Sequence, residues 1–207
     1  MEKARWLPLL RLMVGSAAIW PLRHWLTAEQ IAARSPGQTG VAALFLLALY
    51  VVKSLSVAFP LSVLEAAAGL LFPFPVALAV NLGGVLLAHT LPFLLGRQGQ
   101  QGLNALIARY PQLSALQADA LQPGKTVFLL RLAGAAPGDL VSLYLGAAGL
   151  PLRAYLLGGF LGSFPRVVAA TLLGAALWEI GTSRFWLSLL PGALLTTLSF
   201  FLWRRWK

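Results

Sequence analysis

The sequence predicts an all-α integral membrane protein: a helical bundle with two opposed re-entrant (broken) helical hairpins related by an inverted repeat. Composition is the first observation, because 58% of the 207 residues are hydrophobic and only 11% are charged. That is too little charge to cover a water-facing surface. The second observation is that the charges fall singly between long apolar runs. The third is that prolines interrupt two of these runs, and a proline ends or breaks a helix.

Charge balance and missing motifs exclude several classes of protein. The formal net charge of +10 would suit nucleic acid only if the basic residues clustered, and instead they are scattered like cytoplasmic anchors of membrane helices. There is no cysteine, and we find no H-E-x-x-H, G-x-S-x-G, Walker or dinucleotide-binding motif. We therefore expect no enzyme activity, no cofactor, no metal and no nucleic-acid partner. Both ends of the chain are basic, which predicts a multi-pass protein of a bacterial plasma (inner) membrane with both termini in the cytoplasm.

The first part of the chain contains an anchor and a second span. Residues 7–25 predict a tilted, uncleaved anchor helix, and the alternative is a cleaved signal peptide. Residues 26–39 predict an exposed loop. From residue 40 to 64 the chain is apolar apart from one lysine, which predicts a second span ending around Pro60. The whole chain then divides into an anchor helix with its loop, a membrane domain, and a final transmembrane helix with a basic tail, at residues 1–39, 40–180 and 181–207.

A long uncharged stretch at residues 66–96 carries the first predicted hairpin. Pro73 and Pro75 lie inside it and stop a helix there. The piece before them is too short to cross a membrane, whereas residues 76–96 are long enough. The lengths fit a broken hairpin that enters and leaves by one face, followed by a spanning helix.

The second half is predicted to follow a similar order. Residues 103–122 are amphipathic and predict an interfacial helix pair. Residues 126–150 predict a second broken hairpin with its break at Pro137. Two spans then follow, at residues 154–178 and 185–203.

Proline and glycine recur with nearly the same spacing in the two halves. The spacings are P-x8-G-x14-G-x11-G and P-x8-G-x15-G-x11-G, formed by Pro60, Gly69, Gly84 and Gly96 and by Pro137, Gly146, Gly162 and Gly174. Glycine lets membrane helices approach closely, so equal spacing predicts equivalent helix breaks and helix contacts. The alternative is a chance alignment, since the chain has 20 glycines.

Four charged residues inside the apolar region are the candidate site. Glu65 and Asp139 lie near the two predicted hairpin entrances, Arg131 precedes the second hairpin, and Arg166 lies near the middle of a span. A buried charge is costly unless it is paired, so such acids form ion pairs or hold a proton. An arginine beside them is a planar receptor for phosphate. The alternative is structural, with Glu65–Arg131 and Asp139–Arg166 acting as locks between hairpins.

Other polar residues have simpler interpretations. Lys53 and Arg153 are interpreted as residues whose charged ends reach the membrane interface. Asn81 and His89 are expected to make hydrogen bonds between helices.

Several motifs together resemble the VTT domain, the shared core of the DedA and SNARE-associated Golgi protein superfamily. They are Phe128-Leu129-Leu130-Arg131-Leu132, Pro137, Gly146, Gly162, Pro165 and Gly174, and in the first half Ala67-Ala68-Gly69-Leu70-Leu71-Phe72 and Phe93-Leu94-Leu95-Gly96-Arg97. The likeness covers roughly residues 40–180 and is closer to the branch of yeast Golgi vesicle proteins than to DedA proper. It implies two re-entrant hairpins facing each other and movement of lipids, and it carries the family's hairpin arginine over to Arg131. In this chain the second DedA arginine is replaced by Pro137, Asp139 stands where the branch has asparagine, and the first-hairpin acid falls at Ser62, a neighbour of Glu65.

The leading functional hypothesis is a lipid flippase or scramblase for phospholipid or a polyprenyl-phosphate carrier. Arg131 would line a groove for the lipid phosphate, and Glu65 and Asp139 would gate it or shuttle protons. Its partners would then be membrane lipids and protons. Two alternatives stay open: a proton- or cation-coupled transporter of small solutes, and a non-transporting protein of membrane homeostasis or assembly.

Overall fold

The computed structural model describes residues 27–56, 59–100, 122–133 and 137–177, with a few isolated positions nearer the termini. Within these ranges the chain forms seven helices and no strand. They are α2 (Ala28–Ala33), α3 (Thr39–Ser54), α4 (Leu61–Leu71), α5 (Phe74–Arg97), α7 (Pro123–Ala133), α8 (Gly138–Ala147) and α9 (Leu152–Ala176). The predicted anchor helix at 7–25, interfacial pair at 103–122 and last span at 185–203 lie outside the described ranges.

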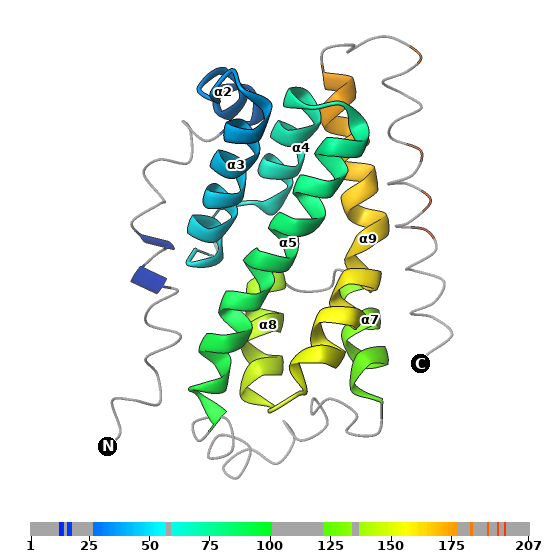
Figure 1. Ribbon diagram of the computed structural model, residues 1–207. Helices are drawn as coiled ribbons and strands as arrows, with labels where there is room; N and C mark the ends of the chain where they lie inside the picture. Colours follow the sequence, from blue (N-terminus) through cyan, green and yellow to red (C-terminus); the bar gives the residue numbers. More distant parts are fainter. Residues whose placement is uncertain are drawn as a thin grey trace.

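Two short helices are followed by a long one twice along the described chain (Figure 1). The short helices α3 and α4 lie in the upper half of the view, and α7 and α8 lie in the lower half. The long helices α5 and α9 run through both halves. We call α3, α4 and α5 the upper unit, and α7, α8 and α9 the lower unit.

The two units pack against each other in a crossed arrangement. Helix α5 packs against α3 of its own unit and against α8 of the lower unit, whereas α9 packs against α7 of its own unit and against α4 of the upper unit. Each long helix therefore contacts the first short helix of its own unit and the second short helix of the other unit.

The repeated glycines lie at these crossed contacts. In the α4–α9 contact, a Cβ added at Gly69 would lie 2.7 Å from Ala175 N, and one at Gly174 would lie 2.6 Å from Ala66 Cα. In the α8–α5 contact, a Cβ added at Gly146 would lie 2.8 Å from the carbonyl carbon of Phe93. These distances leave no room for a side chain, so equivalent positions of the repeat allow equivalent backbone approaches.

The middle glycine of each set has the same role within its own unit. A Cβ added at Gly84 of α5 would lie 2.6 Å from Tyr50 Cγ on α3, and nearer still to other atoms of that ring. One added at Gly162 of α9 would lie 2.8 Å from Arg131 Cβ and 3.1 Å from Phe128 Cα on α7. Gly96 of α5 likewise meets Leu143 of α8, as Gly174 of α9 meets Ala66 of α4, so all three pairs of glycines occupy matching places.

Prolines set where four helices begin. Pro60, Pro73, Pro137 and Pro151 are the N-caps of α4, α5, α8 and α9. Proline has no N–H to leave unpaired and a backbone φ that suits the start of a helix. The predicted helix stop at Pro73 and Pro75 is confirmed, because it separates α4 from α5.

The predicted spans have two different outcomes. Helices α5 and α9 are each long and apolar enough to cross a membrane, and they match the predicted spans 76–96 and 154–178. The predicted span 40–64 is wrong, because α3 ends at Ser54 after 16 residues and the next described helix, α4, begins at Leu61. The first short helix pair is therefore α3 and α4, with its break before Pro60, and not the stretch 66–96 on which we placed the first hairpin.

The apolar core forms two clusters, one in each half of the molecule. The upper cluster includes Leu46, Tyr50, Leu64 and Ala77, and the lower one includes Phe93. The lower cluster is completed by Val127, Leu145, Leu150 and Tyr155. The buried charged side chains of Lys53, Arg131 and Asp139 line one common cavity.

Candidate functional site

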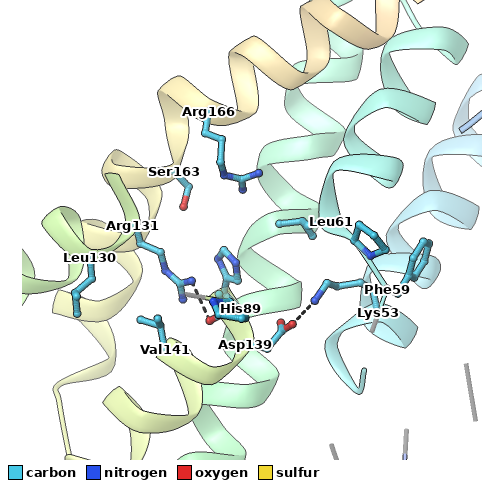
Figure 2. A pocket seen from close by; sticks show the side chains of 13 residues that line it. Lys53, Phe59, Leu61, His89, Leu130, Arg131, Asp139, Val141, Ser163 and Arg166 are labelled. Atoms are coloured by element: carbon cyan, nitrogen blue, oxygen red, sulfur yellow. Dashed lines mark hydrogen bonds and ion pairs between the residues drawn. The ribbon is translucent and has the colours of Figure 1, made fainter. Parts of the chain in front are cut away.

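A cavity of about 290 Å³ lies between the ends of the four short helices α3, α4, α7 and α8. Both N-terminal ends, at Pro60 of α4 and Pro137 of α8, line it, and so do the C-terminal turns of α3 and α7. Figure 2 shows its side chains pointing toward one another from both units. Its walls are formed by Lys53, Phe59, Pro60, Leu61, His89, Leu130, Arg131, Pro137, Gly138, Asp139, Val141, Ser163 and Arg166. The cavity is thus lined by three cations and one carboxylate.

Lys53 and Asp139 form an ion pair across the cavity (Figure 2). Lys53 is on the last turn of α3 and Asp139 on the first turn of α8, so the pair joins the upper unit to the lower unit. Each side chain is 5% exposed. The Lys53 ammonium also donates to Ser56 O at 3.4 Å. This pair is the direct electrostatic contact between the ends of the two short helix pairs.

Arg131 on the last turn of α7 is buried among neutral oxygens. It donates to Gly138 O at 3.0 Å, to Ser142 Oγ at 2.6 Å and to Tyr155 Oη at 2.8 Å. Its Nε is buried and has no hydrogen-bond partner. Neither ion pair found within the described ranges includes Arg131. The guanidinium therefore brings a positive charge to the cavity that no described acid neutralises.

A second ion pair joins α4 to α9. Arg166 Nη1 donates to Glu65 Oε2 at 2.9 Å. The Glu65 carboxylate is fully buried, whereas the Arg166 side chain is 42% exposed. Arg166 therefore lies at an open edge of the cavity, and Glu65 lies behind it.

A neutral network centred on Asn81 of α5 holds the upper half together. Asn81 Nδ2 donates to Glu65 O at 3.0 Å and to Thr171 Oγ1 at 2.8 Å. Tyr50 Oη donates to Asn81 Oδ1 at 2.8 Å. One fully buried amide thus links α3, α4, α5 and α9, and the predicted interhelical hydrogen bonds of Asn81 are confirmed.

The structure brings most of the predicted site residues together but with different partners. Arg131, Asp139 and Arg166 line the cavity, whereas Glu65 reaches it only through Arg166. The predicted locks Glu65–Arg131 and Asp139–Arg166 are wrong, because Glu65 pairs with Arg166 and Asp139 pairs with Lys53. The partners differ from the prediction because the second short helix of each unit packs on the long helix of the other unit.

The packing residues of the prediction have direct structural counterparts. Pro60 and Pro137 cap the two helices whose ends line the cavity. Gly69, Gly146 and Gly162 lie at close helix contacts.

Sequence reasoning missed Lys53, which is 4% exposed and does not reach an interface. A signal was present: Lys53-x30-Gly84 and Arg131-x30-Gly162 have the same spacing, so the repeat extends back to the two cations. Tyr155 and Ser142, which hold Arg131, were also missed as site residues. His89 lines the cavity, and its carbonyl accepts a hydrogen bond from Tyr155 Oη at 3.0 Å.

In the part of the chain that the structure describes, these features are those of a helical bundle with two helices long and apolar enough to cross a membrane, and with a cavity lined by three cations and one carboxylate. Residues 59–176 match the family model of the VTT domain, and this stretch is more than half of the chain. The chain belongs to the VTT domain family, the domain of the DedA and SNARE-associated Golgi proteins. That family is membrane-associated, is linked to membrane transport and homeostasis, and is not known as an enzyme family. Comparison with curated proteins and with solved structures gives no match. The assignment to the branch of yeast Golgi vesicle proteins stays a prediction.

Proposed function

We propose that this protein moves phosphate-bearing lipids between the two leaflets of a membrane, as a flippase or scramblase. The observation that carries the proposal is the cavity lined by Lys53, Arg131 and Arg166. Cationic side chains in an otherwise apolar bundle suit a charged head group that has to cross a hydrocarbon layer. The predicted location, a bacterial plasma membrane with both termini in the cytoplasm, is part of the same proposal.

The short helix pairs α3–α4 and α7–α8 would be the two re-entrant hairpins. The 16 residues of α3 are about 24 Å long, less than the roughly 30 Å of a hydrocarbon core. Non-helical backbone at membrane depth is tolerated where it is buried in protein or lines a cavity, and Phe59 and Pro60 do line the cavity. Hairpins that enter from opposite faces would meet there.

The crossed packing supports an inverted repeat. If a two-fold axis in the membrane plane relates the two units, then each contact of α5 with α8 has a counterpart of α9 with α4, and both contacts occur. The matching roles of Gly69 with Gly146 and of Gly84 with Gly162 support the same relation. The cavity would then lie on that axis, near the middle of the membrane.

The open edge of the cavity suits a lipid, because a head group can enter while its acyl chains stay in the membrane. Leu130 on the cavity wall is 38% exposed. The side chain of Arg166 at the same cavity is 42% exposed. The cavity wall thus has both an apolar and a cationic group that are partly exposed, and these match the two ends of a phospholipid.

The two acids would gate this path and could exchange protons. Asp139 Oδ1 and Glu65 Oε1 are buried carboxylate oxygens without a hydrogen-bond partner in the described part of the chain. A buried carboxylate in this condition is sensitive to a proton or to a change in its cationic neighbour.

Reconstitution in liposomes tests the proposal. Purified protein would be inserted into vesicles with labelled phospholipid or labelled polyprenyl phosphate, and movement between leaflets would be measured with and without a pH gradient. We expect movement that Arg131→Ala reduces by about tenfold or more, because a charge-assisted phosphate contact contributes more than about 1.4 kcal/mol. Arg153→Ala, which changes an exposed arginine at the start of α9, is the matched control and is expected to keep full movement.

Three results would overturn the proposal or part of it. Movement that is unchanged in Arg131→Ala removes Arg131 from the path. Uptake of a small solute that depends on Glu65, without lipid movement, favours the solute transporter. Absence of any transport in folded protein favours a role in membrane homeostasis or assembly.

A further inference from the structure

The charges around the cavity leave one positive charge uncompensated. Three cations, Lys53, Arg131 and Arg166, face two carboxylates, Asp139 and Glu65. Lys53 and Arg166 each have an acidic partner, and Arg131 has only neutral oxygens. The net charge of these five side chains is therefore +1, and Arg131 is the residue whose charge is not compensated.

Two helix N-termini add to the attraction for an anion at the same place. Helix α4 begins after Pro60 and α8 begins after Pro137, and neither has a side chain that caps its first N–H groups. Both starts line the cavity, and so does the buried Arg131, whose Nε has no hydrogen-bond partner. The N-terminal end of a helix carries a partial positive charge and favours an anion.

One anionic group of the chain itself, the Asp139 carboxylate, already lies at the cavity. Asp139 lies on the first turn of α8, at the positive end of that helix, and its carboxylate is bound to Lys53. In this way the chain supplies one anion of its own to the cavity. Without Asp139, the site would have two uncompensated positive charges.

We infer that the cavity is a site for one singly charged phosphodiester head group, and that Asp139, held on Lys53, is the residue that sets this specificity. The inference rests on the proposed function and names the substrate class of that site. A phosphodiester brings one negative charge, shared by two oxygens that can accept from donors on opposite walls. It neutralises Arg131 and leaves the cavity without net charge. A phosphomonoester brings close to two charges, and the second would be buried next to Asp139 at a large cost.

Binding by two lipids that differ in this charge tests the inference. Full-length protein in detergent micelles would be titrated at about pH 8 with phosphatidylglycerol, a diester, and with phosphatidic acid, a monoester that is close to doubly charged there. Native mass spectrometry gives the two dissociation constants. Soluble glycerophosphoglycerol, added in a separate arm, distinguishes a lipid head group from a free phosphodiester. We expect the wild-type protein to prefer the diester lipid by about tenfold.

Two variants make the test specific to charge. Asp139→Asn raises the net charge of the site by one, so we expect the preference to move by about tenfold or more toward phosphatidic acid. The double variant Lys53→Gln with Asp139→Asn removes both charges of the pair and keeps the wild-type balance. It also leaves neither residue of this pair as a buried charge without its partner, so it is the control for folding. We expect it to keep the preference for the diester.

The outcomes separate this inference from the proposed function. A diester preference that Asp139→Asn shifts and the double variant restores supports the inference. Lipid binding with the same preference in all three proteins overturns it and leaves the proposed function standing. Absence of binding of either lipid to the wild-type protein overturns the inference, and the proposed function then depends on the movement of polyprenyl phosphate in vesicles. Equal affinity for the soluble diester and for the lipid would show that the site recognises the head group alone.

Discussion

The upper and lower units place a buried cation at the same position and use it differently. Lys53 lies on the last turn of α3, and Arg131 lies on the last turn of α7. Lys53 is neutralised by Asp139 of the other unit, whereas Arg131 is surrounded by neutral oxygens of its own unit. The two cations thus lie at matching places, and the neighbouring residues determine which contacts each charge makes. One cation joins the units, and the other has no acidic partner among the described residues.

The upper unit also has a neutral polar network that the lower unit replaces with a charged one. In the upper half, Asn81 bonds Tyr50, Thr171 and the Glu65 carbonyl. In the lower half, Arg131 is the donor at the centre of the network. A network of neutral groups with all partners present stabilises a fold, whereas a network that contains an unbalanced charge carries a desolvation cost. This difference predicts opposite effects of mutation on stability and transport.

Removing Lys53 is expected to have the largest effect on stability. Lys53→Met leaves the buried Asp139 carboxylate without its cation, and breaking a buried pair in this way costs about 3–5 kcal/mol of unfolding free energy. Denaturation in mixed micelles would measure it. The double variant Lys53→Met with Asp139→Leu removes both charges and is expected to recover most of the loss. Equal destabilisation by the single and double variants would contradict a role for the ion pair in joining the units.

The sequence could predict the places of close packing and the charged residues, but not how the charges pair. The spacing of Pro60 and Pro137 and of the glycines located the helix starts and contacts, because these residue types have strict backbone requirements. The end of α3 at Ser54 was missed because Ser56 and Phe59 are buried, and buried non-helical chain has the same hydropathy as helix. The partner of Lys53 depends on which helix of one unit packs on the other, and hydropathy does not contain that information.

The repeated glycines give the next largest effect, and they test whether the units are equivalent. Gly69→Val and Gly146→Val each put a side chain where another helix backbone already lies, and overpacking of this kind costs about 3 kcal/mol. Thermal unfolding in detergent would compare them. Gly83→Ala is the matched control, since a Cβ there meets only Leu47 Cδ2 at 3.9 Å. It is expected to be neutral or stabilising by up to about 1 kcal/mol. Very different losses at Gly69 and Gly146 would contradict the equivalence.

The two networks are expected to respond with smaller and unequal losses. Asn81→Leu leaves Tyr50 Oη, Thr171 Oγ1 and the Glu65 carbonyl without this partner, which costs about 2 kcal/mol. Tyr155→Phe keeps the ring stacked on Phe93 at 4.0 Å and loses only the hydroxyl, which costs about 1 kcal/mol. The effects on lipid movement are expected in the opposite order. Tyr155→Phe removes one contact of Arg131 and slows lipid movement, whereas Asn81→Leu leaves lipid movement near the wild-type rate. A larger transport defect in Asn81→Leu would place the upper network in the path.

Removing Arg131 is expected to have the smallest effect on stability. Arg131→Met loses three hydrogen bonds, but their oxygens stay bonded to each other, because Tyr155 Oη lies 2.8 Å from Ser142 Oγ and Ser142 Oγ donates to Gly138 O at 2.7 Å. The variant also removes a buried charge that no acid compensates, which offsets the loss. The unfolding free energy should therefore change by less than about 1 kcal/mol, while lipid movement in vesicles is lost. If Arg131→Met is instead as unstable as Lys53→Met, then the two cations have the same structural role, and the unbalanced charge is not kept for a ligand.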